Sequence, residues 1–261
     1  MKVLVVGGGG REHALSWALR REDPATTLYC APGNPGTAEL ATNLPIAAED
    51  LDGIVAACDR LDIALTIVGP EIPLSLGLAD RLAARGRAVF GPTADAARIE
   101  SSKAFAKELM TTAGVPTAAS RTFTELPAAL EYIGHHAEPL VVKASGLAAG
   151  KGAVVCATRA EACEAAGAML GDRRFGTAGQ TIVIEEFMTG EELSVLAITD
   201  GRGLFILPPA QDHKRLGEGD SGPNTGGMGA YSPVSIAKPE LLDRVRTTVF
   251  EPTLSALERM G

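Results

Sequence analysis

The chain has 261 residues, of which 46% are hydrophobic and 21% are charged, and its formal net charge is −8. This length allows one large or two ordinary domains with real cores, and an acidic chain without a basic patch argues against a nucleic-acid-binding protein. No apolar run approaches the ~20 residues that span a bilayer, and the first residues are strand-like rather than a signal sequence.

The four cysteines and four histidines are scattered along the chain. Cys30, Cys58, Cys156 and Cys163 have neither paired nor metal-like spacing, and three of them stand in apolar surroundings. Such cysteines are typical of reduced, packed thiols in a cytoplasmic protein. The spacing of the histidines makes a zinc site improbable.

Strand-like and helical segments alternate over the first part of the chain. Apolar runs at 2–6, 26–30, 63–68 and 88–90 are separated by helical stretches such as Leu74 to Arg85. This alternation predicts an α/β fold with a doubly wound parallel sheet. We expect this first domain to end near residue 120.

A glycine-rich loop, Gly7 to Gly10, follows the first predicted strand and precedes a helix. Its amides and the helix N-terminus would favour a phosphate. A dinucleotide site is the alternative, but Glu12 or His13 would occupy the position that needs a small residue, and no acidic residue follows the second strand. The loop therefore favours a nucleotide-like or sugar-phosphate ligand over NAD.

A predicted helix from Ser102 to Ala113 has a serine cap and ends at Gly114. Lys103 lies in its first turn, where the helix dipole disfavours a cation. This position suggests an anionic partner for Lys103.

A small domain is expected from about residue 121 to 189, with strands LVVKAS, AVVCA and TIVIEE and a helix from Ala160 to Leu170. The loop that follows Lys143 offers backbone amides and a lysine to phosphate oxygens. It is no Walker motif, because Gly152 follows Lys151 and another strand comes next. We therefore expect a hairpin folded over phosphates.

The strand Ile182 to Ile184 runs into a second candidate ligand site. The backbone from Glu186 to Met188 could pair with the edge of an adenine, and Glu192 could accept from ribose hydroxyls. Solvated acidic strand ends are the simpler alternative.

The remainder, from residue 190 onward, starts with a predicted hairpin around Asp200 and Gly201. The polar, glycine-rich run from Gln211 to Pro233 has almost nothing to bury, so we expect a functional loop or a disordered one. We expect an amphipathic helix from Glu240 to Met260, kinked at Pro252.

Taken together, the motifs resemble those of the ATP-grasp ligases and, within them, the phosphoribosylamine–glycine ligase (glycinamide ribonucleotide synthetase) family. The resemblance runs from Met1 to about Gly261. It rests on these strings: MKVLVVGGGGREHAL, GNPGT, VGPE, FGPT, SSKAFAKELM, KASGLAAGKG, EEFMTGEE, and QDHKR through PNTGGMGAYSP.

The resemblance implies three parts: an N-terminal Rossmann-like phosphoribosylamine-binding domain (1–120), an ATP-grasp small subdomain (121–189) and an incomplete large subdomain (190–261). The implied ATP contacts are Lys103, Lys143, Ser145, Gly146, Gly150, Gly152, Glu185, Glu186, Phe187, Met188 and Glu192. The implied catalytic residues are Lys151, Asp212 and Lys214. The implied substrate contacts are Gly9, Arg11, Glu12, Asn34, Gly36, Gly69, Pro70, Glu71, Asn224, Thr225 and Gly226.

The implied reaction joins glycine to 5-phosphoribosylamine through a glycyl phosphate, with ATP as the energy source, in purine biosynthesis. The family's magnesium ligands, an acidic and amide pair, are expected beyond Gly261. The expected partners are small-molecule substrates, with no nucleic acid and no membrane. Two alternatives stay open: another ATP-grasp carboxylate–amine ligase, and a truncated, non-catalytic nucleotide-binding module.

Overall fold

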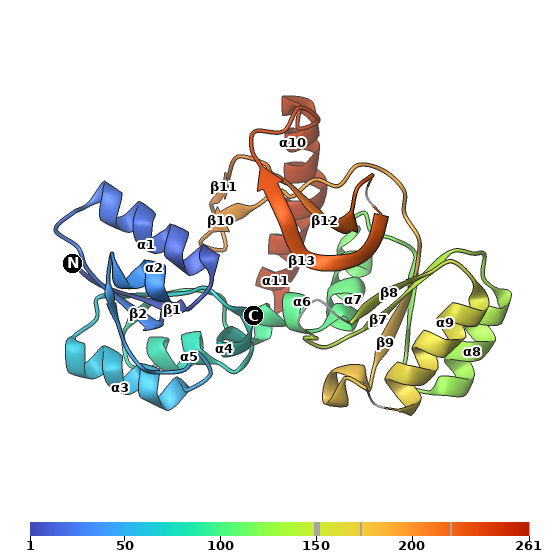
Figure 1. Cartoon of the computed structure of the whole chain (residues 1–261), viewed down its shortest axis with the longest axis horizontal. Helices are drawn as coiled ribbons and strands as arrows, with labels where there is room; N and C mark the ends of the chain where they lie inside the picture. The colour runs from blue at the N-terminus through green and yellow to red at the C-terminus, as the bar shows by residue number, and fades with distance from the viewer. Residues whose placement is uncertain (149–151, 173, 220, 261) are drawn as a thin grey trace. The chain divides into compact units, whose positions relative to one another are not determined.

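The computed structural model describes residues 1–148, 152–172, 174–219 and 221–260 (Figure 1). Its contacts divide the chain into two compact units, Met1–Ser101 and Ser102–Gly261. Each unit has its own sheet and its own core, so each is described by itself.

The first unit is built on a parallel sheet, as the sequence predicts, with a fifth, two-residue strand besides the four expected ones. The strand order is β3-β2-β1-β4-β5, with every pair parallel. The strands are β1 (Lys2–Gly7), β2 (Thr27–Pro32), β3 (Thr42–Asn43), β4 (Leu65–Val68) and β5 (Ala88–Phe90).

Helices cover both faces of this sheet. On one face, Leu15 and Leu19 of α1 (Gly10–Glu22) pack against Val3 and Leu28. On the other face, a larger core contains Leu4 and Val6 with side chains from α3 (Leu51–Leu61), α4 (Glu71–Ser75) and α5 (Leu78–Ala83). Successive side chains of a strand point to opposite faces, so one apolar strand supplies both cores. Two further helices, α2 (Pro35–Ala38) and α6 (Ala94–Ser101), complete the unit.

The helix expected from Leu74 to Arg85 is instead two short helices, α4 and α5. Gly77 separates them with a backbone φ of 87°. This left-handed conformation is open to glycine at low cost and ends an α-helix.

The second unit contains a four-stranded sheet of order β6-β9-β7-β8 in which all pairs are antiparallel. Its strands are β6 (Ser120–Phe123), β7 (Leu140–Ala144), β8 (Ala153–Cys156) and β9 (Ile182–Glu186). The expected strands and the β7–β8 hairpin are confirmed. Helices α8 (Leu126–His135) and α9 (Arg159–Ala166) pack on one face, with Ile133 and Met169 in the core. A π-turn, Gly167–Gly171, extends α9, and a 3₁₀ turn spans Gly176–Gly179.

Helix α7 (Lys103–Ala113) has the predicted ends. The Ser102 hydroxyl accepts from the Phe105 amide, and Gly114 has a φ of 69°. The helix is fastened to the second unit, because the Lys103 amide donates to the Ser145 carbonyl and the Ala104 amide to the Ser145 hydroxyl. The first compact unit therefore ends at Ser101, earlier than the expected boundary near residue 120.

The polar run is an antiparallel ribbon, not a loop or a disordered segment. It is formed by β12 (Gln211–Gly217) and β13 (Ser221–Tyr231), with register irregularities near Arg215. The prediction of a loop or a disordered segment rested on the polar composition, but backbone hydrogen bonds form a ribbon without apolar side chains. The hairpin of β10 (Ala197–Thr199) and β11 (Leu204–Ile206) is confirmed, and the Asp200 carboxylate accepts from the amides of its turn.

The C-terminal helical stretch is irregular near the expected kink at Pro252. It consists of α10 (Pro239–Val245), a π-helical turn (Arg246–Phe250) and α11 (Glu251–Met260). Proline lacks an amide hydrogen and its ring collides with the carbonyl four residues earlier, which the wider turn accommodates. Within the described ranges, no helix is both long and apolar enough to cross a membrane.

Candidate functional site

In the first unit, three loops meet at the carboxyl edge of the sheet. They follow β1 (Gly7 to Gly10), β2 (Gly33 to Thr37) and β4 (Gly69 to Glu71). Strand order reverses between β1 and β4, and such a switch point is where open α/β sheets bind ligands. The topology thus brings together the eight substrate residues expected in this domain.

Glu12 is the most buried charged residue of this edge, with 3% of its surface exposed. Its Oε2 accepts from the Gly9 amide at 2.7 Å, and its Oε1 accepts from Arg11 Nε at 2.8 Å. A methyl group placed on Gly69 would lie 1.9 Å from Glu12 Oε1, and one on Gly7 would lie 2.7 Å from its Cδ. The two glycines therefore make the room that the carboxylate fills.

Glu12 and Arg11 differ in their exposure to solvent. An ordinary solvated helix start does not describe Glu12, which is buried, although the neighbouring Arg11 is exposed and its Nη2 lies 3.9 Å from Glu71 Oε2. Glu12 also stands where a dinucleotide fold needs a small residue between helix and strand, which is the ground on which NAD binding is not expected. The Gly9 amide is already bonded to Glu12, so an anion at this helix start would meet later amides.

The loop after β2 is fixed by its own side chains. Asn34 Nδ2 donates to the carbonyls of Gly8 and Gly9, and Asn34 Oδ1 accepts from the Thr37 amide. Gly36 lies beneath the His13 ring, since an added Cβ would be 2.7 Å from His13 Cε1. Pro70 is the N-cap of α4. These contacts hold the loops after β1 and β2 together.

In the second unit, the side chain of Lys143, in β7, lies beside the buried carboxylate of Glu185. Its Nζ donates to Glu185 Oε2 at 2.7 Å, and Lys107 Nζ lies 3.4 Å from Glu185 Oε1. The Glu185 side chain is 7% exposed and that of Lys143 is 29% exposed. The family resemblance implied Lys143 and Glu185 as ATP contacts but gave no sign of Lys107.

The segment after Lys143 is tied to α7 and to the loop before β9. Ser145 is buried and its hydroxyl accepts from the Ala104 amide, while its contact with ATP stays a prediction. Lys103 Nζ donates to the Gly146 carbonyl, and the Ala144 amide donates to the Gly152 carbonyl. The predicted residues Gly150 and Lys151 lie outside the described residues.

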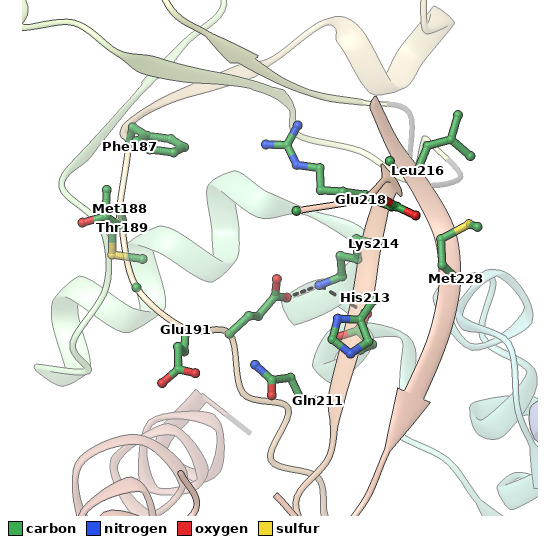
Figure 2. Close-up of a pocket in the computed structure, with 16 residues that line it drawn as sticks. Phe187, Met188, Thr189, Glu191, Gln211, His213, Lys214, Leu216, Glu218 and Met228 are labelled. Atoms are coloured by element: carbon green, nitrogen blue, oxygen red, sulfur yellow. Dashed lines mark hydrogen bonds and ion pairs between the residues drawn. The ribbon is translucent and has the colours of Figure 1, made fainter. Parts of the chain in front are cut away.

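A pocket of about 860 Å³ lies between the segment after β9 and the ribbon (Figure 2). Phe187 and Met188 stand on one side, with His213 and Lys214 of β12 on the other. Five predicted residues line it: Phe187, Met188, Glu192, Asp212 and Lys214. Its lining also includes residues that were not in the predicted set: Thr189, Gly190, Glu191, Gln211, His213, Arg215, Leu216, Gly217, Glu218, Gly219 and Met228.

Charged groups of both signs meet in this pocket. Lys214 donates to Glu192, and its Nζ lies 3.6 Å from Asp212 Oδ2. The bond to Glu192 raises the pKa of Lys214 above its usual 10.5. Asp212 Oδ1 is buried without a hydrogen-bond partner among the described residues, which leaves it open to a donor from a ligand.

The remaining predicted residues lie nearby but do not line the pocket. Glu186 accepts from the Ala119 amide through Oε1. The Thr225 hydroxyl donates to the Lys214 carbonyl, and Gly226 is an open position of β13. The side chain of Asn224 lies outside the described part of the chain. Among the described residues, no group of three acidic, histidine or cysteine side chains could hold a metal ion.

Comparisons with known proteins fit this division into two units. The N domain of phosphoribosylglycinamide synthetase matches residues 1–100, and the ATP-grasp (A) domain of the same enzyme matches residues 101–261. The chain belongs to the phosphoribosylglycinamide synthetase family. The second unit is therefore an ATP-grasp fold, as the motifs predicted.

Relatives of this family match nearly the whole chain. A phosphoribosylamine–glycine ligase from Xanthomonas axonopodis pv. citri is 51% identical over 98% of this chain and 60% of its own length. A trifunctional purine biosynthetic protein from Gallus gallus is 48% identical over all of this chain, which is 26% of its length. The chain thus spans about 60% of the single-function relative.

Solved structures agree on the fold. A phosphoribosylamine–glycine ligase from Thermotoga maritima is 34% identical with a TM-score of 0.84, covering 100% of this chain and 62% of that one. A biotin carboxylase from Campylobacter jejuni, at 15% identity and a TM-score of 0.75, covers 98% of this chain and 59% of its own. The similarity to the biotin carboxylase shows a shared fold and nothing more.

Proposed function

We propose that the protein takes part in the ATP-dependent ligation of glycine to 5-phosphoribosylamine, giving glycinamide ribonucleotide, ADP and phosphate. The observation that carries this proposal is the match of both family domains to a chain in which eight predicted residues lie at one sheet edge and five others line one pocket. The first site is the switch point of the parallel sheet, and the second is the pocket beside the ribbon.

In this proposal, the first unit holds phosphoribosylamine. The loops after β1, β2 and β4 supply Gly9, Asn34, Gly36, Gly69 and Pro70, which fix the backbone close to the ligand. Arg11 meets the phosphate, because it is exposed beside the start of α1. The carboxylates Glu12 and Glu71 complete the edge and accept from hydroxyl or amino groups.

ATP lies along the second unit. The backbone of residues 186–188 pairs with adenine, with Phe187 and Met188 beside the base, and Glu192 accepts from the ribose. Lys103, Lys143 and Lys151 face the phosphates, with Gly146, Gly150 and Gly152 allowing close approach. Lysine charge at these oxygens stabilises the phosphoryl group as it transfers.

Asp212 and Lys214 face the reacting groups in the pocket. A glycine carboxylate oxygen attacks the γ-phosphorus, and the bond to the ADP oxygen breaks. The phosphoribosylamine nitrogen then attacks the acyl carbon, phosphate leaves, and the nitrogen loses a proton. Lys214 neutralises the carboxylate, Asp212 Oδ1 accepts from an amino group, and residues 224–226 border the substrate. The protein mainly positions the reactants.

Magnesium accompanies ATP in this proposal, but the described residues offer no cluster that fits the ion. No step is therefore assigned to it. We place the reaction in the cytoplasm, where reduced thiols persist, because Cys30, Cys58, Cys156 and Cys163 are all free.

The test is ADP release measured with each substrate withheld in turn. The proposal expects release that requires both glycine and phosphoribosylamine. Release that depends on a different carboxylate or amine would indicate another ATP-grasp ligase. ATP binding without release under any of these conditions would indicate a nucleotide-binding module.

Replacing Lys143 by Ala tests the nucleotide site itself. A charge-assisted contact contributes ~1.5–3 kcal/mol, so the affinity for ATP should fall by roughly ten- to a hundredfold. Lys143→Arg keeps the charge but changes the reach, and should recover only part of the loss. Unchanged affinity of the alanine variant in calorimetry would remove Lys143 from the site.

A further inference from the structure

Lys107 lies one helical turn after Lys103 on α7, and its surroundings differ from those of the other lysines in the second unit. Its side chain is 11% exposed. The ammonium donates to the Thr117 hydroxyl at 2.7 Å and to the Ala118 carbonyl at 3.0 Å, and lies 3.4 Å from Glu185 Oε1. The ammonium therefore has two hydrogen bonds, to Thr117 and Ala118, and one ion pair, to Glu185.

Lys143 approaches the same carboxylate from the other side. It bonds to Glu185 Oε2 at 2.7 Å, while Lys107 faces Oε1. Among the described residues Glu185 is the hydrogen-bond partner of the Lys143 ammonium, which leaves two donors of this more exposed side chain for other acceptors. The two lysines thus share one carboxylate, but Lys143 has more hydrogen-bond donors available for a ligand than Lys107 has.

The formal charges of the three side chains sum to one positive charge. A buried carboxylate needs a cation and hydrogen bonds to offset its lost hydration. If Lys143 were its sole partner, the pair would be neutral and little positive charge would remain at the end of β7. With Lys107 present, Glu185 is already compensated, and the surplus charge lies on the lysine that can still donate.

We propose that Lys107 is a positioning residue of the nucleotide site. It anchors and neutralises Glu185, so that Glu185 holds Lys143 by one hydrogen bond and Lys143 directs its charge and remaining donors at the phosphates. This inference rests on the proposed binding of ATP at Lys143. Lys107 itself does not touch the nucleotide, because its side chain is largely buried and its ammonium is held by Thr117, Ala118 and Glu185.

The experiment measures the affinity of ATP and of adenosine by calorimetry in four proteins: wild type, Lys107→Met, Glu185→Gln and the double variant. Lys107→Met should weaken ATP about tenfold while leaving adenosine within about twofold, because Glu185 would then neutralise the Lys143 charge that faces the phosphates, which adenosine lacks. A purely structural role would weaken both ligands. Lys2→Met, in the first unit, is the matched control and should change neither affinity.

The double variant separates positioning from contact. Without the carboxylate, Lys143 keeps its charge whether or not Lys107 is present, so Lys107→Met/Glu185→Gln should bind ATP within about threefold of Glu185→Gln. This variant also buries no unpaired carboxylate, which guards against a folding defect.

Three results would overturn the inference. Lys107→Met could bind ATP like the wild type, which means that Glu185 needs no second cation. The double variant could stay about tenfold weaker than Glu185→Gln, which means that Lys107 contacts the nucleotide directly. Lys143→Ala, measured in parallel, could leave ATP binding unchanged, in which case the proposed nucleotide site fails first. Loss in Lys143→Ala with no loss in Lys107→Met would refute the inference alone.

Discussion

The edge of the first sheet and the ribbon of the second unit both gather charged residues, but they hold them differently. Glu12 is buried and bonded to the Gly9 backbone in a space that glycines leave open. Glu192 and Lys214 form an ion pair beside the pocket, and their side chains are 57% and 42% exposed, respectively. The comparison suggests that the first site is shaped before a ligand arrives, whereas the second is held by ion pairs that a ligand can exchange.

The largest expected contrast comes from adding one methyl group to each region. Gly69→Ala places a carbon 1.9 Å from Glu12 Oε1, whereas nothing lies within 4 Å of the methyl of Gly226→Ala. Overpacking should destabilise the first unit by about 2 kcal/mol or more. Fluorescence of Trp17, the one tryptophan, follows urea unfolding of that unit.

The matched variant Gly226→Ala should unfold like the wild type when followed by circular dichroism. If the two alanines had equal effects, the edge of the first sheet would be no more rigid than the ribbon.

Removing one carboxylate from each region should give a smaller contrast. Glu12→Ala leaves the Gly9 amide without its partner and should cost about 2 kcal/mol. Glu192→Ala removes an exposed partner of Lys214 and should cost at most about 1 kcal/mol. Urea titrations of both variants check the order, and a larger loss in Glu192→Ala would reverse the comparison.

The smallest effect concerns pH and the ribbon. The pKa of Lys214 is raised by its bond to Glu192, so the pair stabilises the fold below pH 10.5 and loses that contribution as pH rises through the raised value. The stability difference between wild type and Lys214→Met should therefore be present at about pH 9 and shrink well above 10.5. A stability difference between the two proteins that grows as the pH rises above 10.5 would contradict the raised pKa of Lys214.

Much of the fold follows from local patterns in the sequence. Apolar strands alternate with helices in the first unit, and Ser102 and Gly114 mark both ends of α7, as predicted. The ribbon escaped prediction because glycine-rich strands pair through their backbones and carry no alternation of apolar side chains.

The site residues divide in the same way. The motifs of the family resemblance brought Glu12, Lys143 and Lys214 forward as candidates. The burial of Glu12 depends on Gly69, far along the chain, and the role of Lys107 depends on Glu185 in a strand of another segment. Such contacts arise only when the fold brings residues together that are distant in the sequence, so no local pattern predicts them.

The most direct test of the account is a pair of variants measured against two ligands by calorimetry. Gly9→Val puts a branched side chain 3.0 Å from Glu12 Oε2, in the first unit, and Lys143→Ala removes a charge from the second. The account predicts that Gly9→Val loses ribose 5-phosphate but keeps ATP, that Lys143→Ala does the reverse, and that NAD does not bind the wild type. Saturable NAD binding, or ribose 5-phosphate bound equally by wild type and Gly9→Val, would contradict it.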